Sequence, residues 1–357
     1  MQHIIDRFSQ VIRTSAGNKS PLWITGGGSK DFYGNLADRP DGSIVDTTAY
    51  SGIVNYEPTE LVITVRAGTR LVDLEMELRN QHQMLAFEPP HFSSGATIGG
   101  CVAAGLSGPR RASAGAVRDF VLGVRMLDGR GEDLSFGGQV MKNVAGYDIS
   151  RLMTGSMGTL GLLLEISLKV MPLPAQELTL RMEMDEAEAI GKMNSWAARP
   201  LPISATCFRE GELFCRLSGA EPAVRAAHAK LGGEEIIEGA AFWESVREQT
   251  NSFFQSGTPL WRLSVNPTTP PLSLPGKQLM EWGGALRWLA SEADAATVRA
   301  EAEKAGGHAT LFRRYGQSLQ AAAFSPLTPA MLKISQRLKE QFDPLRIFNP
   351  GRIYAEI

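Results

Sequence analysis

The sequence predicts an α+β protein with a glycine-rich first part and a smaller α+β second part. Three glycine-rich turns lie between predicted strands and helices in the first half of the chain. After Pro172 and Pro174 the pattern changes to alternating strands and helices, which is typical of a small sheet with helices on one face. We therefore expect domains at residues 1–175 and 176–325, followed by a C-terminal helix and tail at 326–357.

The composition excludes several classes of function. The chain has 357 residues and a net charge of −2, so its charge does not favour nucleic acid or an anionic membrane as a partner. No apolar run reaches the ~18 residues of a membrane span, and residues 1–15 predict an amphipathic helix rather than a signal peptide. Three cysteines and five histidines, none at metal-ligand spacing, predict neither a disulfide framework nor a metal site. A reducing, cytoplasmic compartment is the simplest expectation.

In the first part, short apolar runs that end in turn residues predict strands in "PLWIT", "GSIVDTT" and "LVITVRAG". "TRLVDLEMELRNQHQ" predicts a helix, because Leu71, Leu74 and Leu78 fall on one face and Thr69 can cap its start. "DFVLGVRMLDGRGEDLSF" predicts a hairpin around an Asp-Gly turn. "YDISRLMTGSMGTLGLLLEISLKVMPLP" predicts a helix, a glycine-rich turn and a long strand.

In the second part, "ELTLRMEM" predicts a strand and "DEAEAIGKMNSWAA" a helix. "ISATCFREGELFCRLSG" predicts a hairpin that turns at Glu210, and "EPAVRAAHAKLGG" a further helix. The proline-rich residues 266–277 predict a surface loop. The chain ends in "LTPAMLKISQRLKEQFDPLRIFNPGRIY", which predicts one helix and an extended tail.

The first glycine-rich turn, "TGGGSK", directly follows a strand, as phosphate-binding turns do. Its spacing does not match G-x-x-x-x-G-K-[ST], nor G-x-G-x-x-G, because Asp31 stands where the last glycine of that motif should be. Three residues that can adopt positive φ could still bring successive N–H groups together around an anion. A tight turn within a sheet explains the same residues.

The second and third turns each have two explanations. "SSGATIGGCVAAGLSG" predicts a short helix after Thr97 whose small residues would accept either a flat ligand or a closely packed helix. In "TGSMGTLGLLLEISLKV", glycines again separate a helix from a strand, which a buried turn also explains. Three such turns within about 170 residues are harder to explain as turns alone. A dinucleotide, with a pyrophosphate in the middle and a planar ring at each end, would fit all three.

In their order along the chain, these segments resemble the FAD-binding domain of the vanillyl-alcohol oxidase / p-cresol methylhydroxylase flavoproteins. The resemblance covers about residues 1–175 and 342–354, and "DPLRIFNPGRIY" corresponds to the usual ending of that family. It implies a two-part FAD-binding domain with a smaller α+β cap domain, with FAD between the two and with the C-terminal helix and tail returning to the FAD domain.

The resemblance also implies which residues contact FAD. The first turn would bind the pyrophosphate through its backbone, and the second would line the pyrophosphate and flavin. The third turn would meet the adenine or ribose, Asp119 would pass along the cofactor, and Asn349 would close the flavin end. The implied residues are Gly26, Gly27, Gly28, Ser29, Lys30, Gly95, Ala96, Thr97, Gly99, Gly100, Cys101, Asp119, Gly161, Leu162, Leu163 and Asn349.

The sequence departs from the family at the position of covalent attachment. Many members hold FAD through a histidine just after the first glycines, whereas Ser29, Lys30 and Asp31 follow them here. We therefore expect non-covalent FAD.

A second departure concerns the substrate. Larger relatives that oxidise 2-hydroxy acids carry H-x-G-D-G-N-x-H in the cap domain, and this sequence has no such motif, so its catalytic residues stay unassigned. Such an oxidation needs a cation for the carboxylate and a base for the hydroxyl proton. Arg313 and Arg314 near His308 are candidates, as are Arg110 and Arg111. A solvated strand end and a solvated loop explain the two pairs more simply.

"GATIGGCVAAGLSGPRRASAGAVRDFVLG" is most similar to accessory flavoprotein subunits of three-component bacterial oxidases that act on glycolate. This implies an FAD-binding subunit that acts with a larger flavin subunit and an iron–sulfur subunit on glycolate or a related 2-hydroxy acid. The complex would be cytoplasmic, or peripheral on the inner face of the cell membrane through its partners. A stand-alone FAD-dependent dehydrogenase and a structural paralogue with a vestigial flavin site are the alternatives. Phe254, Trp282 and Trp288 are candidates for partner contacts or for ordinary cap core.

Overall fold

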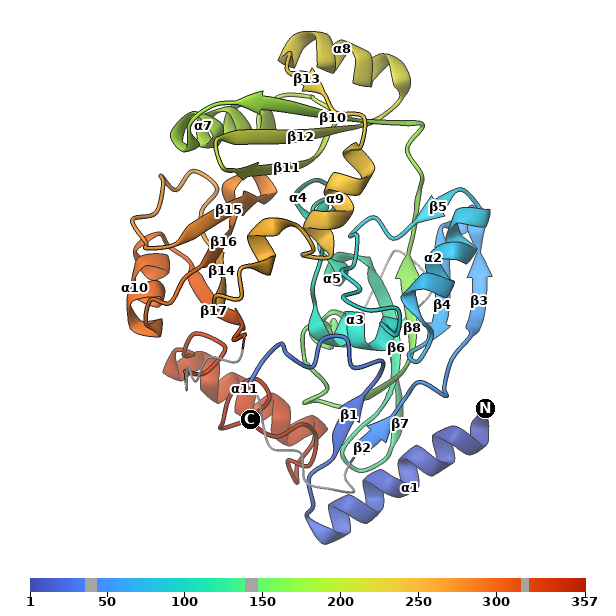
Figure 1. Cartoon of the computed structure of the whole chain (residues 1–357). Coiled ribbons are helices and arrows are strands. Elements are labelled where there is room, and N and C mark those ends of the chain that lie inside the picture. Colours follow the sequence, from blue (N-terminus) through green and yellow to red (C-terminus); the bar gives the residue numbers. More distant parts are fainter. Residues whose placement is uncertain (36–43, 139–146, 316–320) are drawn as a thin grey trace.

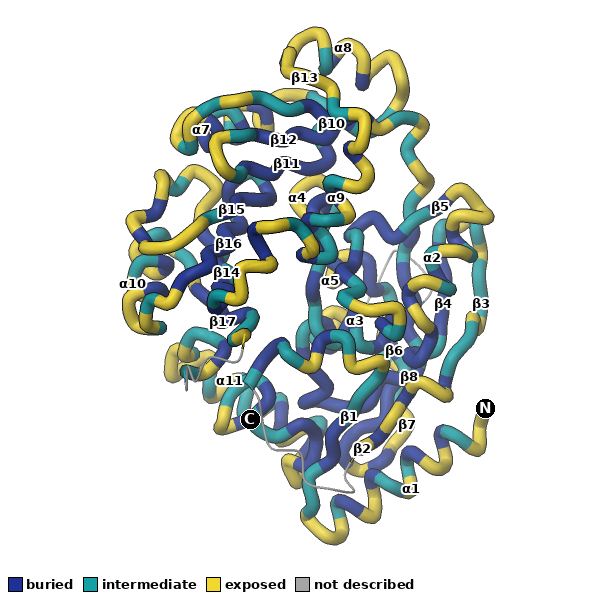
Figure 2. The backbone as a smooth tube through the Cα atoms, viewed as in Figure 1, coloured by how far each residue is buried: buried dark blue, intermediate teal, exposed yellow. Residues whose placement is uncertain are grey.

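The computed structural model has two main sheets, each in its own part of the molecule (Figure 1). It describes residues 1–35, 44–138, 147–315 and 321–357. Helices and strands are mixed throughout, so the expected α+β class is confirmed. Figure 2 shows that the strands of both sheets are largely buried, whereas one side of several outer helices, such as α1 and α8, is exposed.

The first part is built on a five-stranded antiparallel sheet in the order β3-β4-β8-β6-β7. Thr64 of β4 lies opposite Ser167 of β8, and their hydroxyls are 2.8 Å apart. Two smaller pairs lie outside this sheet, β1 with β2 in parallel and β5 with β9 antiparallel. The strands are β1 (Trp23–Thr25), β2 (Ile44–Asp46), β3 (Ile53–Glu57), β4 (Val62–Arg66), β5 (Gln83–Met84), β6 (Val121–Leu127), β7 (Asp133–Gly137), β8 (Leu162–Lys169) and β9 (Met171–Pro172).

The helices of this part are α1 (Gln2–Asn18), α2 (Leu71–Asn80), α3 (Ile98–Ala104), α4 (Arg111–Ala114), α5 (Val117–Phe120) and α6 (Ile149–Leu152). The predicted apolar face of α2 is confirmed, because Leu71, Leu74 and Leu78 are fully buried. The predicted cap is wrong. Arg70 holds the N-cap position, and the Thr69 hydroxyl bonds to the turn before it, where it donates to the Arg66 carbonyl at 2.7 Å.

The second part is an eight-stranded antiparallel sheet in the order β13-β10-β12-β11-β15-β16-β14-β17. Helices α7, α8 and α10 pack on one face of it, whereas α9 packs on the opposite face, so the prediction of helices on one face alone is wrong. The elements are β10 (Gln176–Glu183), α7 (Glu186–Ala197), β11 (Ile203–Arg209), β12 (Glu212–Gly219), α8 (Glu221–Leu231), β13 (Glu234–Glu235), α9 (Gly239–Arg247), β14 (Leu260–Ser264), β15 (Lys277–Glu281), β16 (Leu286–Ala290), α10 (Ala295–Lys304) and β17 (His308–Arg313).

The opposite face of this sheet packs against the first part through an aromatic cluster that includes Tyr33 and Phe312. Phe254, Trp282 and Trp288 belong to this cluster and are 1%, 7% and 5% exposed. They are therefore interior residues, and the suggestion that they are exposed partner contacts is wrong. These large aromatic side chains are buried because the first part packs against this face of the sheet.

The C-terminal helix α11 (Pro329–Phe342) and the tail after it lie beside the first part. The tail reaches β1, where Leu22 and Phe348 form a parallel bridge. Lys339 and Asp343, both fully buried, form an ion pair at 2.9 Å, and the Lys339 ammonium also donates to the Thr159 carbonyl. Strand β8 and strand β10 lie on either side of the proline pair, and the exact division into three segments stays a prediction.

Candidate cofactor site

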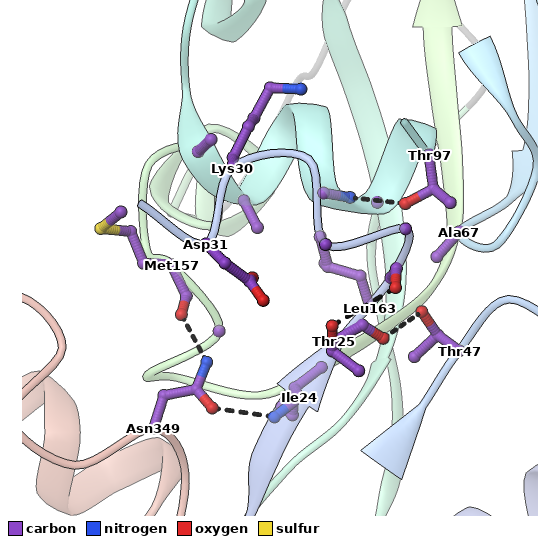
Figure 3. A pocket seen from close by; sticks show the side chains of 18 of the residues that line it. Ile24, Thr25, Lys30, Asp31, Thr47, Ala67, Thr97, Met157, Leu163 and Asn349 are labelled. Carbon is purple, nitrogen blue, oxygen red and sulfur yellow. Dashed lines mark hydrogen bonds between the residues drawn. The ribbon is translucent and has the colours of Figure 1, made fainter. Parts of the chain in front are cut away.

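The three glycine-rich turns meet at one cavity, drawn in Figure 3. The cavity has a volume of about 110 Å³ and is partly open to solvent. Its lining consists of Trp23, Ile24, Thr25, Gly26, Gly27, Gly28, Ser29, Lys30, Asp31, Thr47, Ala67, Thr97, Gly99, Gly100, Ala103, Ala104, Ser156, Met157, Gly158, Gly161, Leu163, Asn349 and Arg352.

The first turn begins where β1 ends and lies directly against the second. A Cβ on Gly27 would be 1.6 Å from the carbonyl oxygen of Gly95, and a Cβ on Gly26 would be 2.4 Å from the hydroxyl oxygen of Thr97. Only glycine therefore allows this approach. Gly28 follows with a φ of 68°. The N–H groups of Gly27, Gly28 and Ser29 donate no hydrogen bond within the described residues, so three adjacent donors remain for an anion.

The second turn leads into the short helix α3. Thr97 caps it as predicted, because its hydroxyl oxygen accepts the Gly100 N–H at 3.2 Å. A Cβ on Gly99 would be 2.8 Å from the side chain of Ala67 on the turn after β4, so this glycine lets α3 lie close to the sheet. Ala103 and Ala104 continue the small-residue lining of the cavity. A flat ring could lie against this wall without meeting a large side chain.

Asn349 joins the third turn to the first. Its Nδ2 donates to the Met157 carbonyl at 2.7 Å, and its Oδ1 accepts the Ile24 N–H at 2.8 Å (Figure 3). Asn349 is 6% exposed, and its own backbone has a φ of 39°. The tail therefore fixes the distance between β1 and the third turn, although 325 residues separate Asn349 from Ile24.

Lys30 is the buried cation of the first turn. Its ammonium donates to the Ser29 hydroxyl at 3.2 Å and to the His91 carbonyl at 3.4 Å, and it lies 5.5 Å from the centre of the Phe92 ring. Burial lowers its pKa, and the nearby Glu248 partly opposes this effect. Its positive charge adds to the backbone donors of this turn.

These features fit FAD. A cradle in which a Cβ would collide with the backbone, three neighbouring N–H donors and a buried cation suit a pyrophosphate. The wall of glycine and alanine suits a flat ring.

Comparison with known proteins agrees with this geometry. Residues 5–137 match the FAD binding domain family. Over 357 residues the sequence is 49% identical to the glycolate oxidase subunit GlcE of Escherichia coli (strain K12), a match that covers 100% of this chain and 98% of the relative. This chain belongs to the GlcE family. The resemblance to FAD-binding flavoproteins is thereby confirmed, and FAD is the cofactor of this domain.

Two further matches are partial or distant. The glycolate oxidase subunit GlcD of Bacillus subtilis (strain 168) is 30% identical over 203 residues, which cover 56% of this chain and 42% of GlcD. The solved alkyldihydroxyacetonephosphate synthase has the same fold, with a TM-score of 0.64 at 13% identity over 97% of this chain and 74% of that one. This chain thus shares part of its sequence with GlcD and its architecture with a wider group.

Most of the residues implied by sequence reasoning lie at the cavity of this GlcE-family chain. Those that line it are Gly26, Gly27, Gly28, Ser29, Lys30, Thr97, Gly99, Gly100, Gly161, Leu163 and Asn349. Gly95 lines an adjoining cavity together with Gly27 and Thr97. Ala96, Cys101 and Leu162 are buried in the core beside the turns, and burial raises the pKa of the Cys101 thiol to about 12. The Asp119 carboxylate accepts the Ala116 N–H at 2.9 Å.

Sequence reasoning missed several lining residues. Thr47 follows β2, and its hydroxyl donates to the Thr25 carbonyl at 3.0 Å. Ala67 follows β4, and Arg352 belongs to the tail. None of them lies in a glycine-rich segment, so no local pattern marked them. Met157 and Gly158 lie within the third turn, and the glycine pattern there could have indicated both.

The two arginine pairs occupy different places. Arg110 is 7% exposed, and it donates to Glu88 and Glu177, so the solvated-loop interpretation is wrong for this residue. Arg313 lies 3.6 Å from the centre of the Phe32 ring and donates to Gln249. Arg314 donates to the Gly34 carbonyl at 3.2 Å. All three join the first part to the second.

Charged side chains form a network where the two parts meet. The Glu88 carboxylate accepts the Arg216 guanidinium at 2.8 Å and the Arg110 N–H at 2.8 Å. Burial raises the pKa of Glu88, but Arg216 and Arg110 outweigh it and hold that pKa below its usual value. Across the described residues, no three metal-ligating side chains gather in one place.

Proposed function

We propose that this chain is the FAD-binding subunit of a glycolate oxidase complex that oxidises glycolate or a related 2-hydroxy acid to the 2-oxo acid. The observation that carries the proposal is the cavity built by the three turns, in a chain that is 49% identical to GlcE over its whole length. When bound, FAD supplies the two-electron acceptor for such an oxidation.

We propose that the first turn holds the pyrophosphate. Gly27, Gly28 and Ser29 would donate their N–H groups to it, and Lys30 would add its charge. Gly99 and Gly100 would lie along the flavin side, and Gly161, Leu163 and Asn349 would line the rest of the cofactor.

We propose that FAD is held non-covalently. Histidine, cysteine and tyrosine, the side chains that could carry a flavin, do not occur among the described residues that line the cavity. Precipitating the purified protein with acid tests this point: the flavin should stay in the supernatant, and flavin in the pellet would contradict it.

We propose that the chain acts with a larger flavin subunit and an iron–sulfur subunit. Two named relatives are both glycolate oxidase subunits, which supports a complex of several chains. An iron–sulfur cluster needs about four cysteines, whereas this chain has three, all of them buried. None of the helices in the described ranges is long and apolar enough to cross a membrane. We propose that any contact with the inner face of the membrane is made through the partners.

Co-expression tests the proposal. The tagged chain, purified from cells that also express the larger flavin subunit and the iron–sulfur subunit, should retain both and reduce a dye with glycolate. The matched preparation without this chain should lose the activity. Full glycolate-dependent activity in its absence would contradict the proposal.

A further inference from the structure

The aromatic cluster at the junction lies directly behind one end of the cofactor cavity. Met157 lines the cavity and belongs to the cluster, and Ala104 lines the cavity and packs against the cluster. The ammonium of Lys30, a third lining residue, lies 5.5 Å from the centre of the Phe92 ring, which also packs against the cluster. Figure 3 places Lys30 and Met157 on the side of the cavity away from Ala67.

This is the end of the cavity at which a flat ring would lie. The wall of small residues follows helix α3 from Gly99 and Gly100, near the first turn, to Ala103 and Ala104. Leu106, two residues further along the chain, is a buried member of the cluster. With the pyrophosphate at the first turn, a ring that follows this wall points toward the cluster.

Rings from both parts of the molecule interlock here. Phe32 of the first part lies edge to face with Phe92 and with Phe312 of β17, with ring centres 5.5 and 5.4 Å apart. Phe312 also contacts Tyr33 at 5.0 Å and Trp288 of β16 at 4.9 Å between ring centres. Phe312 is 1% exposed and Trp288 is 5% exposed. Aromatic pairs at such distances attract each other beyond the area that they bury, so these rings hold the two parts together.

Little space remains inside the cluster. The cavity between Phe92, Trp288 and Phe312 has a volume of about 20 Å³, which is room for about one water molecule. A 2-hydroxy acid is several times larger than a water molecule, so it cannot enter unless a ring moves. Hydride transfer requires the reacting atoms to approach within about 3–3.5 Å of each other. An acid that stays outside the cluster therefore cannot react with a flavin ring behind it.

Phe32 and Phe92 form the outer edge of the cluster. Both are half-buried, and the guanidinium carbon of Arg313 lies 3.6 Å from the centre of the Phe32 ring and 4.9 Å from that of Phe92. Arg313 also donates to the Gln249 side chain at 3.2 Å, within the second part. A cation over the face of an aromatic ring is attracted to it, so the second part covers this edge.

We propose that the aromatic cluster shields the flavin end of the cofactor cavity, so that a small 2-hydroxy acid does not reach the flavin of this chain. The acid would be oxidised at the larger flavin subunit, whose flavin takes the hydride from the carbon while a base there takes the hydroxyl proton. That second statement rests on the proposed function. The shield itself rests on the interlocked rings, the small space between them and their contacts with the cavity.

Sulfite tests the shield, because this small nucleophile adds to an accessible oxidised flavin and bleaches its visible absorption. Sulfite is added to the purified holoprotein, and the rate of bleaching is measured per bound flavin. Phe32→Ala and Phe92→Ala should each bleach at least tenfold faster than wild type. Phe92→Tyr, which keeps a ring at this position, should bleach as slowly as wild type does.

Phe136→Ala is the matched control. Phe136 is also half-buried and lies edge to face with Phe342, with ring centres 6.2 Å apart, but it belongs to the core of the first part. Its loss should leave the bleaching rate unchanged. The reduction potential of the flavin should stay the same in all variants, because each loses only an uncharged ring.

Three results would overturn the shield. One is an equal bleaching rate in wild type, Phe32→Ala and Phe92→Ala, whether that rate is fast or slow. Another is an equal rise in Phe136→Ala, since a general loosening of the fold would then explain the effect. The third is a rise that follows a matching shift in reduction potential, which would assign the effect to the flavin's electronic environment.

Glycolate keeps the two proposals apart. Added to the wild-type holoprotein without its partners, glycolate should leave the flavin oxidised. Reduction of that flavin would overturn the shield and leave the proposed function standing. If the sulfite rates are as expected but the complete complex does not oxidise glycolate, the proposed function is wrong and the shield stands.

Discussion

The cofactor cavity and the junction between the two parts are built from opposite kinds of residue. The cavity is formed by glycine, alanine and backbone groups, and at Gly27 even one added carbon would collide with the chain opposite. The junction is formed by charged and aromatic side chains, such as Glu88, Arg216 and Trp282. A cavity that binds through its backbone depends on the path of the chain, whereas the junction depends on side chains that can be replaced one at a time.

This contrast leads to an asymmetric expectation. Side-chain substitutions at the junction should change stability and leave FAD in place. Substitutions that disturb the backbone around the cavity should remove FAD. The predictions below begin with the largest expected effect.

Lys339→Met should cost about 3–5 kcal/mol of unfolding free energy, because it leaves Asp343 buried without its cation. The tail would also lose the ammonium that donates to the Thr159 and Phe348 carbonyls, so FAD affinity should fall. Urea unfolding and FAD titration measure both effects. Lys333→Met, at an exposed position of the same helix, is the control, and equal midpoints for the two variants would contradict the prediction.

Glu281→Gln should remove a pH dependence of stability. Burial raises the pKa of Glu281 to about 7 from an ordinary value of 4.5, so the folded form keeps a proton that the unfolded form releases. Wild-type stability should therefore fall by about 3 kcal/mol between pH ~4.5 and pH ~7 because of this group, and the glutamine variant should lack that fall. Unfolding free energies measured across this range test it, and parallel curves for the two proteins would contradict it.

Glu88→Gln should cost about 2–3 kcal/mol, because it removes the buried charge between Arg216 and Arg110. FAD content should stay at the wild-type level. Glu188→Gln, which alters an exposed pair with Lys192, should cost under about 1 kcal/mol. Loss of FAD from the folded Glu88→Gln protein would break the contrast between the two regions.

Asn349→Ala should cost about 2 kcal/mol, since it leaves the Ile24 N–H and the Met157 carbonyl without their partner. It should also weaken FAD binding, because Asn349 aligns the first and third turns. Asn251→Ala in the second part also removes two side-chain hydrogen bonds to the backbone and should destabilise without changing FAD affinity. Equal FAD affinity in both variants would show that the alignment does not matter.

The two regions also differ in how far the sequence predicts them. The three turns could be predicted from their glycines, because two backbone segments can approach this closely only where glycine leaves room. No local pattern indicated Thr47 and Ala67, because they follow strands β2 and β4, which only the folding of the chain places beside the cavity. Asn349 also comes from a segment distant in the sequence, so the resemblance to the family indicated it and no local pattern did.

The junction was largely beyond prediction from local patterns. Arg110 was expected in a solvated loop, and it is buried because its partners, Glu88 and Glu177, lie 22 and 67 residues away in the sequence. The sequence left Trp282 and Trp288 as either partner contacts or cap core, and the structure shows that they are core residues covered by the first part. Which side chains meet at the junction depends on how the two parts pack together. The periodicity of a single segment carries no information about that packing.

The flavin content of two alanine variants tests the central claim most directly. Gly27→Ala places a carbon 1.6 Å from the Gly95 carbonyl oxygen, whereas Gly191→Ala adds the same carbon to an open position on helix α7. Each protein is purified without added FAD, its fold is checked by circular dichroism, and its flavin absorption per chain is measured. Wild type and Gly191→Ala should carry flavin, and folded Gly27→Ala should carry almost none. A folded Gly27→Ala protein with the full wild-type flavin content would contradict the account.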